Sequence, residues 1–169
     1  MKKINLLPFD SQSNEIKVKA ALKNSLTQIH CTWELTGIAL NSKNNIGTQK
    51  EELWKTNVFE FFLKKKSEEK YYEIHLDEFL NWNIYQSSHY RSELLKTNDI
   101  LIEQANINSN EKRSIISLSL KLTKNILSKK EWLFLCPVIW KVKNTFQYFS
   151  PRHPEEKPDF HLSEYYNEL

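Results

Sequence analysis

The chain has 169 residues, of which 40% are hydrophobic and 27% are charged, and its net charge is +3. This length and composition are typical of one globular domain whose core needs no metal or disulfide, so residues 1–169 are predicted to form a single domain. The densest basic runs, Lys64–Lys66 and Lys129–Lys130, both have glutamates beside them. A nucleic-acid-binding surface would be larger and one-sided, so we expect no nucleic-acid partner.

No targeting or membrane segment is evident in the sequence. The residues Met1–Pro8 lack the apolar region and the cleavage site of a signal peptide, and no apolar run is long enough to span a bilayer. We therefore expect a cytoplasmic protein with no membrane association. Cys31 and Cys136 lie in alternating apolar runs, which favours two buried thiols; a disulfide between facing strands is the alternative.

Alternation of apolar and polar residues is the dominant pattern, and it is typical of strands. The predicted strands are 29–35, 58–63, 71–76, 82–85, 100–103, 116–122, 132–136, 138–142 and 146–149. The charged residues 64–70 are short enough for a hairpin connection, and Pro137 marks a bend or an edge position.

Helical patterns are weaker than the strand pattern. Short helices are expected at 88–96 and 122–133, and a final turn at 163–168. Because the chain has only two glycines, asparagines are expected to supply left-handed turn residues. The prediction is a mainly β, antiparallel β-sandwich with one or two short helices, in which residues 150–169 form a C-terminal strap.

Three segments, in this order, resemble a known family. The first runs from Leu53 to Phe62, the second combines 72–76, 82–85 and Tyr90-Arg91, and the third is 158–161, preceded by His153-Pro154. Over about residues 6–162 the chain resembles the bacterial DOMON-like proteins of the family 9 carbohydrate-binding superfamily. The resemblance implies a β-sandwich. Better-studied relatives bind sugars or haem, and some relatives are found beside or fused to a cell-wall precursor enzyme.

The chain departs from this family in its turns. Asn57 and Val58 stand where the family has Thr-Cys, so no thiol role applies there. Residues 77–80 replace a Ser-Pro-Ser-Gly turn, and Pro8–Asp10 replaces an N-terminal His-Pro pattern. Met1 is the only methionine, which excludes an internal Met ligand to haem, and the five histidines show no zinc spacing. We therefore expect no cofactor and no metal.

Two tryptophans are candidate platforms for a sugar ring. Trp54 precedes one predicted strand and Trp82 begins another, where an exposed indole could stack on the apolar face of a sugar. The alternative for each is packing in the core.

Two glutamates and an arginine are candidate polar contacts. Glu60 and Glu73 each lie in an otherwise apolar strand, and in a hairpin both would project from one face, with Arg91 as their natural partner. One interpretation of this arrangement is a polar cluster that binds the hydroxyls of a ligand. The alternative is a structural role, either as a salt bridge or as the solvent-facing side of a sheet. A glycosidase would need two carboxylates about 5–10 Å apart, one with a raised pKa, and the sequence supplies nothing further for that chemistry.

The proline-rich C-terminal segment carries the last candidates, Asp159 and His161. In an extended chain these two side chains would share a side, as metal ligands or an acid–base pair do. The alternative is a strap that packs Phe160 into the sandwich while Asp159 bonds to backbone.

We conclude from the sequence that the protein is a non-catalytic binding module for a sugar or glycan-like molecule, including a cell-wall precursor. The predicted ligand-binding residues are Trp54, Glu60, Glu73, Trp82, Arg91, Asp159 and His161. The alternative is a protein-interaction or accessory domain that uses exposed aromatics such as Phe59, Phe61, Tyr71 and Tyr72. An enzyme is the least favoured reading, which a strongly raised carboxylate pKa inside a pocket would strengthen. No sequence feature bears on the oligomeric state.

Overall fold

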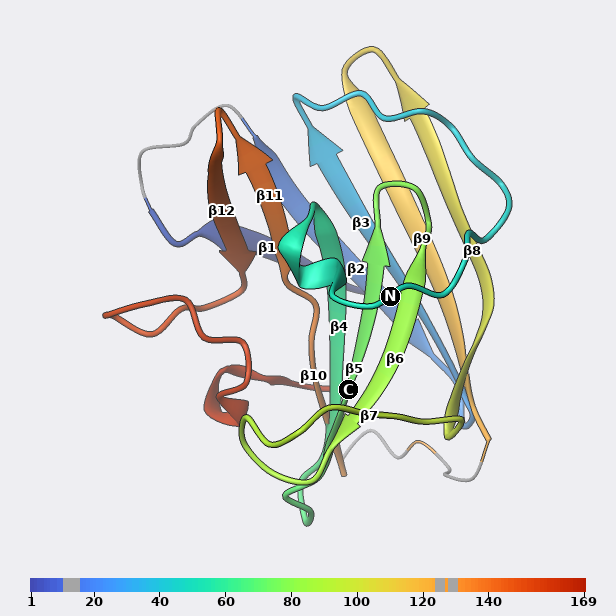
Figure 1. The fold of residues 1–169 in the computed structure, drawn as a ribbon, viewed down its shortest axis with the longest axis vertical. Helices are drawn as coiled ribbons and strands as arrows, with labels where there is room; N and C mark the ends of the chain where they lie inside the picture. The colour runs from blue at the N-terminus through green and yellow to red at the C-terminus, as the bar shows by residue number, and fades with distance from the viewer. Residues whose placement is uncertain (11–15, 124–126, 128–130) are drawn as a thin grey trace.

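The computed structural model describes residues 1–10, 16–123, 127 and 131–169, and its regular structure is almost entirely β (Figure 1). The strands are β1 (Lys2–Pro8), β2 (Lys17–Asn24), β3 (Gln28–Thr36), β4 (Val58–Lys65), β5 (Tyr71–Asp77), β6 (Trp82–Ser87), β7 (Leu95–Lys96), β8 (Ile100–Asn110), β9 (Arg113–Leu122), β10 (Trp132–Leu135), β11 (Val138–Val142), β12 (Thr145–Ser150) and β13 (Asn167–Glu168). Within the described residues the only helical elements are two 3₁₀ turns, η1 (Leu53–Lys55) and η2 (Ser163–Tyr165). None of the described helical segments is long and apolar enough to cross a membrane.

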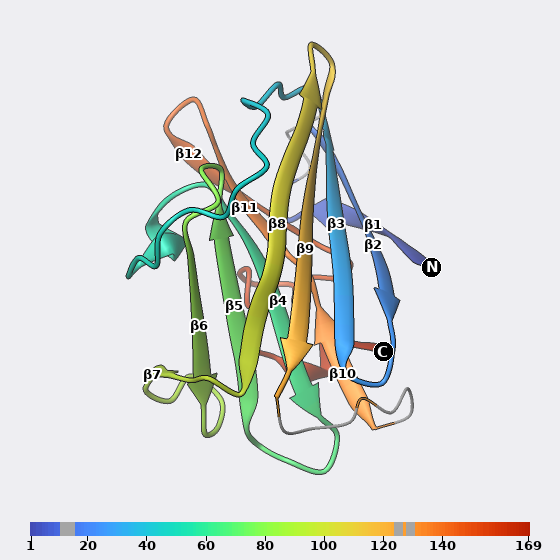
Figure 2. The ribbon, with the colours of Figure 1, turned by 90° about the vertical axis from the view of Figure 1, so that its right-hand side faces the viewer.

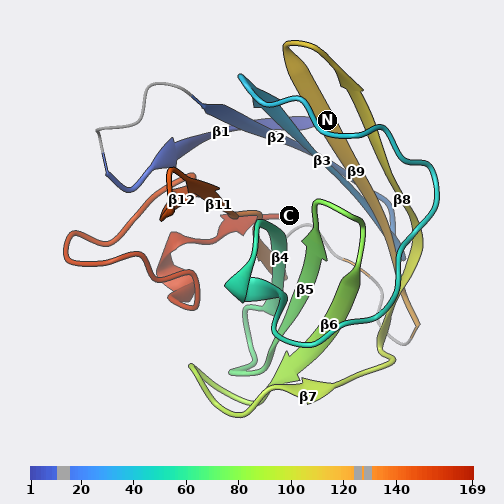
Figure 3. The same ribbon diagram turned by 45° about the horizontal axis from the view of Figure 1, so that its top comes forward.

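The strands form one curled antiparallel sheet. Its order is β7-β6-β5-β4-β11-β12-β1-β2-β3-β9-β8, with β10 beside β4 and β13 beside β10. The curl places β2, β3, β9 and β8 across from β4, β5 and β6 (Figures 2 and 3). Strand β1 joins the two halves because residues 2–6 pair with β2, whereas Leu7 and Pro8 pair with β12. The mainly β, antiparallel prediction is confirmed, but pairing is continuous through β1 instead of dividing into the two separate sheets of the predicted sandwich.

The core fills the space between the two halves. Successive side chains of a strand point to opposite faces, so the alternating residues of β3 and β9 bring one apolar row each to the inside. Trp33 of β3 is fully buried and its ring lies 5.6 Å from that of Phe59 in β4. Its indole N–H also donates to the carbonyl of Cys136, 3.1 Å away. Cys31 and Cys136 are buried free thiols, as the sequence predicted.

Strands β4 and β5 are buried on both faces. Their outer face is covered by the C-terminal segment, defined here as residues 151–166, through Phe160 and Tyr166. These rings pack with Phe62 and Tyr71, which project away from the main core. Double burial explains why both strands read as nearly continuous apolar runs, and it makes the acidic residues within them unusual.

All nine predicted strands are present, with Pro137 between β10 and β11. The helix expected at 88–96 is wrong, because that segment forms a turn followed by β7. The helix expected at 122–133 lies largely outside the described residues, and the final turn is limited to η2. Asparagine does not dominate the left-handed positions: among the described non-glycine residues these are Glu52, Leu80, Arg91, Lys143 and Asn144.

Candidate functional site

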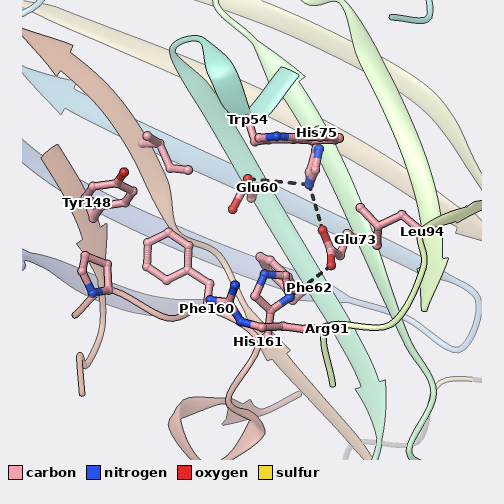
Figure 4. A pocket seen from close by; sticks show the side chains of 12 residues that line it. Trp54, Glu60, Phe62, Glu73, His75, Arg91, Leu94, Tyr148, Phe160 and His161 are labelled. Atoms are coloured by element: carbon pink, nitrogen blue, oxygen red, sulfur yellow. Dashed lines mark hydrogen bonds and ion pairs between the residues drawn. The ribbon is translucent and has the colours of Figure 1, made fainter. Parts of the chain in front are cut away.

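A cavity of about 300 Å³ lies on the outer face of β4 and β5 (Figure 4). Its floor comes from these two strands, and its walls come from η1, the loop before β7, strands β11 and β12, and the C-terminal segment. The lining residues are Trp54, Glu60, Phe62, Glu73, His75, Arg91, Leu94, Ile139, Tyr148, Pro158, Phe160 and His161. Polar side chains gather on the floor and aromatic rings on the walls, as in many small-molecule sites.

Strand register determines the floor. Glu60 lies opposite His75, and Phe62 lies opposite Glu73. Because directly opposed residues project from the same face, these four side chains form two neighbouring rows on the outer face. The structure therefore brings Glu60 and Glu73 to one face, as expected for a hairpin, and it adds His75 between them.

His75 links the two carboxylates. It is only 1% exposed, and its Nε2 lies 3.2 Å from Glu73 Oε2 and 3.6 Å from Glu60 Oε1 (Figure 4). Burial lowers the pKa of His75, but the hydrogen bond with Glu73 and the charges of both glutamates outweigh burial and raise it. Sequence reasoning missed this residue, although its spacing of two from Glu73 places both on one face of a strand.

Glu73 is a fixed anion under the site. It is 2% exposed and lies between His75 and His161. The Nδ1 atom of His161 is 3.2 Å from Glu73 Oε1, which is within ion-pair distance, but the two groups are not aligned for a hydrogen bond. Burial raises the pKa of Glu73, but the interactions with His161 and His75 outweigh it and lower the pKa to about 2. The same His161 nitrogen lies 3.1 Å from the hydroxyl of Tyr71, which further holds the ring.

Glu60 is held much less firmly than Glu73. It is 4% exposed, lines the cavity, and accepts no hydrogen bond on its carboxylate from any described residue. Among these residues its ion-pair partner is His75, whose Nε2 lies 3.6 Å from Glu60 Oε1. Burial raises the pKa of Glu60 to about 7, with a further rise from the charge of Glu73, although His75 and His161 oppose the change. Glu60 is therefore the floor group with hydrogen-bonding capacity left for a ligand.

Trp54 forms the aromatic wall beside Glu60. Its side chain lies on η1, is in part solvent-exposed and borders the cavity. The indole packs edge-on against His75 and Tyr85, with ring centroids 5.7 and 6.1 Å away. Contacts with these two rings hold the orientation of the indole while leaving part of it accessible, which suits stacking on an apolar ligand face.

Asp159 attaches the C-terminal segment to the loop before β7. Its carboxylate lies 3.1 Å from the guanidinium of Arg91, accepts a 2.7 Å hydrogen bond from the Tyr90 hydroxyl, and accepts another from the backbone N–H of His161. Burial raises the pKa of Asp159, but Tyr90, the His161 backbone and Arg91 outweigh it and lower the pKa. The expected pairing of Arg91 with Glu60 or Glu73 is wrong, because Asp159 takes the guanidinium instead.

Trp82 is not brought to this cavity. It lies opposite Leu76 in the β5–β6 pair, on the face that points inward, and it packs half-buried against the main core. The aromatic patch suggested for a protein partner is also not exposed: Phe59, Phe61, Tyr71 and Tyr72 are all buried. Among the described residues, no three His, Cys, Asp or Glu side chains are placed to hold a metal ion.

No protein-family model and no curated protein matches the sequence. Among solved structures, the chain is similar to a "putative carbohydrate-binding protein" from Bacteroides uniformis ATCC 8492, with a TM-score of 0.71 and 11% identity over 98% of this chain and 84% of the other. It is also similar to a family 9 carbohydrate-binding module from Caldicellulosiruptor kristjanssonii in complex with glucose, with a TM-score of 0.50 and 11% identity over 97% and 79% of the two chains. At this identity the likeness concerns the fold alone, and the chain has a fold like that of carbohydrate-binding modules.

Proposed function

We propose that the protein is a non-catalytic carbohydrate-binding module whose ligand occupies the cavity on the outer face of β4 and β5. The observation that carries this proposal is Glu60, a buried carboxylate that opens onto the cavity without a hydrogen-bond donor among the described residues, next to the part-exposed indole of Trp54. A sugar can interact with both residues, since its hydroxyls donate hydrogen bonds to carboxylates and its C–H faces stack on aromatic rings.

Each residue of the site has a distinct role in this proposal. Trp54 stacks on the sugar ring and Glu60 accepts hydrogen bonds from its hydroxyls. His161 and Arg91 contact the ligand from the far side of the cavity, while Glu73 and Asp159 hold these two side chains in place. A cavity of about 300 Å³ suits a single sugar ring. For a ligand of that size we expect a Kd of about 1 mM.

The fold likeness and the sequence resemblance support the same class of ligand. Both structural neighbours are described as carbohydrate-binding, one of them with glucose. The narrower assignment to the DOMON-like proteins is part of the proposal and depends on the motifs around Trp54, Glu73 and Asp159. In the cytoplasmic location expected from the sequence, the ligands at hand are soluble sugars and cell-wall precursors.

A second candidate function, glycan cleavage, is favoured by one observation. A pKa near 7 is what a general acid needs at neutral pH, and burial raises the pKa of Glu60 to about 7. Cleavage also needs a second carboxylate that is free to attack the sugar or to activate water. Glu73 is buried and engaged by two histidines, so it is not free for that step. We therefore prefer binding over cleavage.

Isothermal titration calorimetry with glucose, galactose and N-acetylglucosamine tests the proposal. We expect saturable binding by the wild type, and at least a tenfold loss of affinity in Trp54→Ala and in Glu60→Gln, with unchanged circular dichroism. Glu34→Gln, on β3 and away from the cavity, is the matched control and should bind as the wild type. If no sugar binds the folded protein, the proposal fails and a protein-interaction domain becomes the better account. Release of reducing sugar from glycans would instead establish an enzyme.

A further inference from the structure

A second cavity, of about 270 Å³, adjoins the first and shares His161 with it. Its lining is Lys64, Glu69, Tyr71, Tyr90, His161, Leu162, Ser163 and Glu164. Of the ligand-binding residues predicted from the sequence, His161 is the one that lines this cavity, and the binding function proposed above does not use the second cavity.

Strand register aligns the two cavities. On β4 the outward positions are Glu60 and Phe62 in the first cavity and Lys64 in the second. Strand β5 continues the same row, because Tyr71 of the second cavity lies opposite Lys64. At about 3.4 Å per residue, the floor from Glu60 to Lys64 is roughly 14 Å long. The combined floor is therefore longer than one sugar ring requires.

The second cavity has the chemistry of a sugar subsite. Tyr90 is 48% exposed and offers an aromatic surface at the edge of the cavity. The Lys64 amine lies 3.4 Å from the hydroxyl of Ser163. The cavity therefore has a hydrogen-bond donor, the amine, beside a hydroxyl that can both donate and accept. Glu69 and Glu164 add carboxylate acceptors of opposite charge to Lys64, which leaves no single sign of charge in the cavity. Mixed donors and acceptors beside an aromatic ring suit a neutral polyhydroxyl ligand better than an ion.

We propose that the second cavity is an additional subsite, so that the ligand is an oligosaccharide of at least two units that runs along β4 and β5. One unit stacks on Trp54 over Glu60, the linkage passes His161, and the next unit lies between Lys64 and Tyr90. This inference rests on the proposed function, since it extends the same site.

Calorimetry with matched mono- and disaccharides tests the subsite. The probe sets are glucose with cellobiose and maltose, and N-acetylglucosamine with chitobiose. We expect at least one disaccharide to bind about fivefold or more tightly than its monosaccharide. A Lys64→Ala/Ser163→Ala double variant should keep the monosaccharide affinity and lose the disaccharide gain. Lys19→Ala, exposed on β2, is the control and should retain the gain.

The outcomes separate the two proposals. If monosaccharides bind but disaccharides bind no more tightly, the subsite is refuted and the module stands as a single-sugar binder. Equal loss of mono- and disaccharide binding in the double variant would also refute the subsite, since both side chains would then act on the first cavity. Absence of binding by any of these sugars would overturn the binding function and the subsite together.

Discussion

Glu60 makes the site sensitive to pH. A carboxylate that loses water on burial is easier to protonate, and burial raises the pKa of Glu60 from its ordinary 4.5 to about 7. Between these two values the folded state holds a proton that the unfolded chain releases, so the free energy of unfolding falls as pH rises. His75 acts in the same direction, because its raised pKa contributes stability below about 6.5 that is lost at higher pH.

We therefore predict that the wild type loses stability, on the order of 1–3 kcal/mol, between pH 5 and pH 8. Glu60→Gln should lose clearly less over this range, because glutamine does not titrate, and at pH 8 it should be the more stable protein. Urea unfolding at several pH values measures both effects. The control variant Glu34→Gln, at a half-buried position on β3, should follow the wild-type pH dependence. Parallel curves for all three proteins would contradict a buried, titrating Glu60.

Glu73 supports the raised pKa of His75. It is the nearer of the two carboxylates to His75 Nε2, and its hydrogen bond is the largest of the effects that raise the pKa of His75. We predict that Glu73→Gln lowers the pKa of His75, as followed by NMR titration of the imidazole protons. The variant should also lose about 3 kcal/mol of stability at pH 6, because it leaves buried partners of the ion pairs behind.

Glu60→Gln serves as the comparison for this titration. Because Glu60 lies farther from the imidazole, its removal should lower the pKa of His75 less than removal of Glu73 does. An unchanged His75 pKa in Glu73→Gln would show that the histidine does not depend on this carboxylate.

The sequence predicted the floor of the site better than its walls. The alternation of residues in β4 and β5 can be read from the local sequence, and it correctly predicted that Glu60 and Glu73 lie on one face. The same alternation places His75 on that face, although the sequence analysis overlooked this residue. The pairing of Arg91 with Asp159 joins two segments 68 positions apart in the chain through loops, and no local pattern encodes such a contact.

At the scale of elements, strands with clean alternation were predictable and strands without it were not. Strand β3 buries every second residue and was found. Most of β1 is exposed, and β2 consists largely of lysine, alanine and leucine, which are strong helix formers, so neither gives a clear strand pattern. Strands β7 and β13 have two residues each, and tertiary pairing alone defines them.

The C-terminal segment completes the cavity from outside the sheet, and Phe160 is its anchor. This ring is buried in the outer cluster and lies 6.2 Å from the ring of Tyr148. We predict that Phe160→Ala costs about 3 kcal/mol and exposes the segment to trypsin at Arg152, while the sheet stays resistant. The exposed Phe79→Ala should change neither stability nor cleavage. Protection of the segment in Phe160→Ala would mean that its other contacts, such as those of Asp159 and Tyr166, are enough to hold it.

At the scale of the whole molecule, the curl makes the two halves depend on each other. Strand β1 is hydrogen-bonded into both, and a single core cluster contains residues of both. A wall of the cavity is formed by β11 and β12, which connect to β1, so the geometry of the site depends on closure of the sheet. Unfolding of one half would expose the inner face of the other, and we therefore expect the sheet to unfold as one unit.

Trp33 is the residue whose substitution tests this coupling. It packs on Phe59 across the core, and its N–H donates to the carbonyl of Cys136 on the connection between β10 and β11. Trp33→Phe keeps an aromatic ring but leaves that carbonyl without its donor and opens a small void, so we predict a loss of about 2–3 kcal/mol. Circular dichroism of the sheet and fluorescence of the remaining tryptophans should give coincident unfolding curves, both shifted to lower urea. Trp82→Phe, at a half-buried position on the rim of the core, should shift them less. Separate transitions for the two signals would show that the halves fold independently, and the cavity could then be lost without loss of β3 and β9.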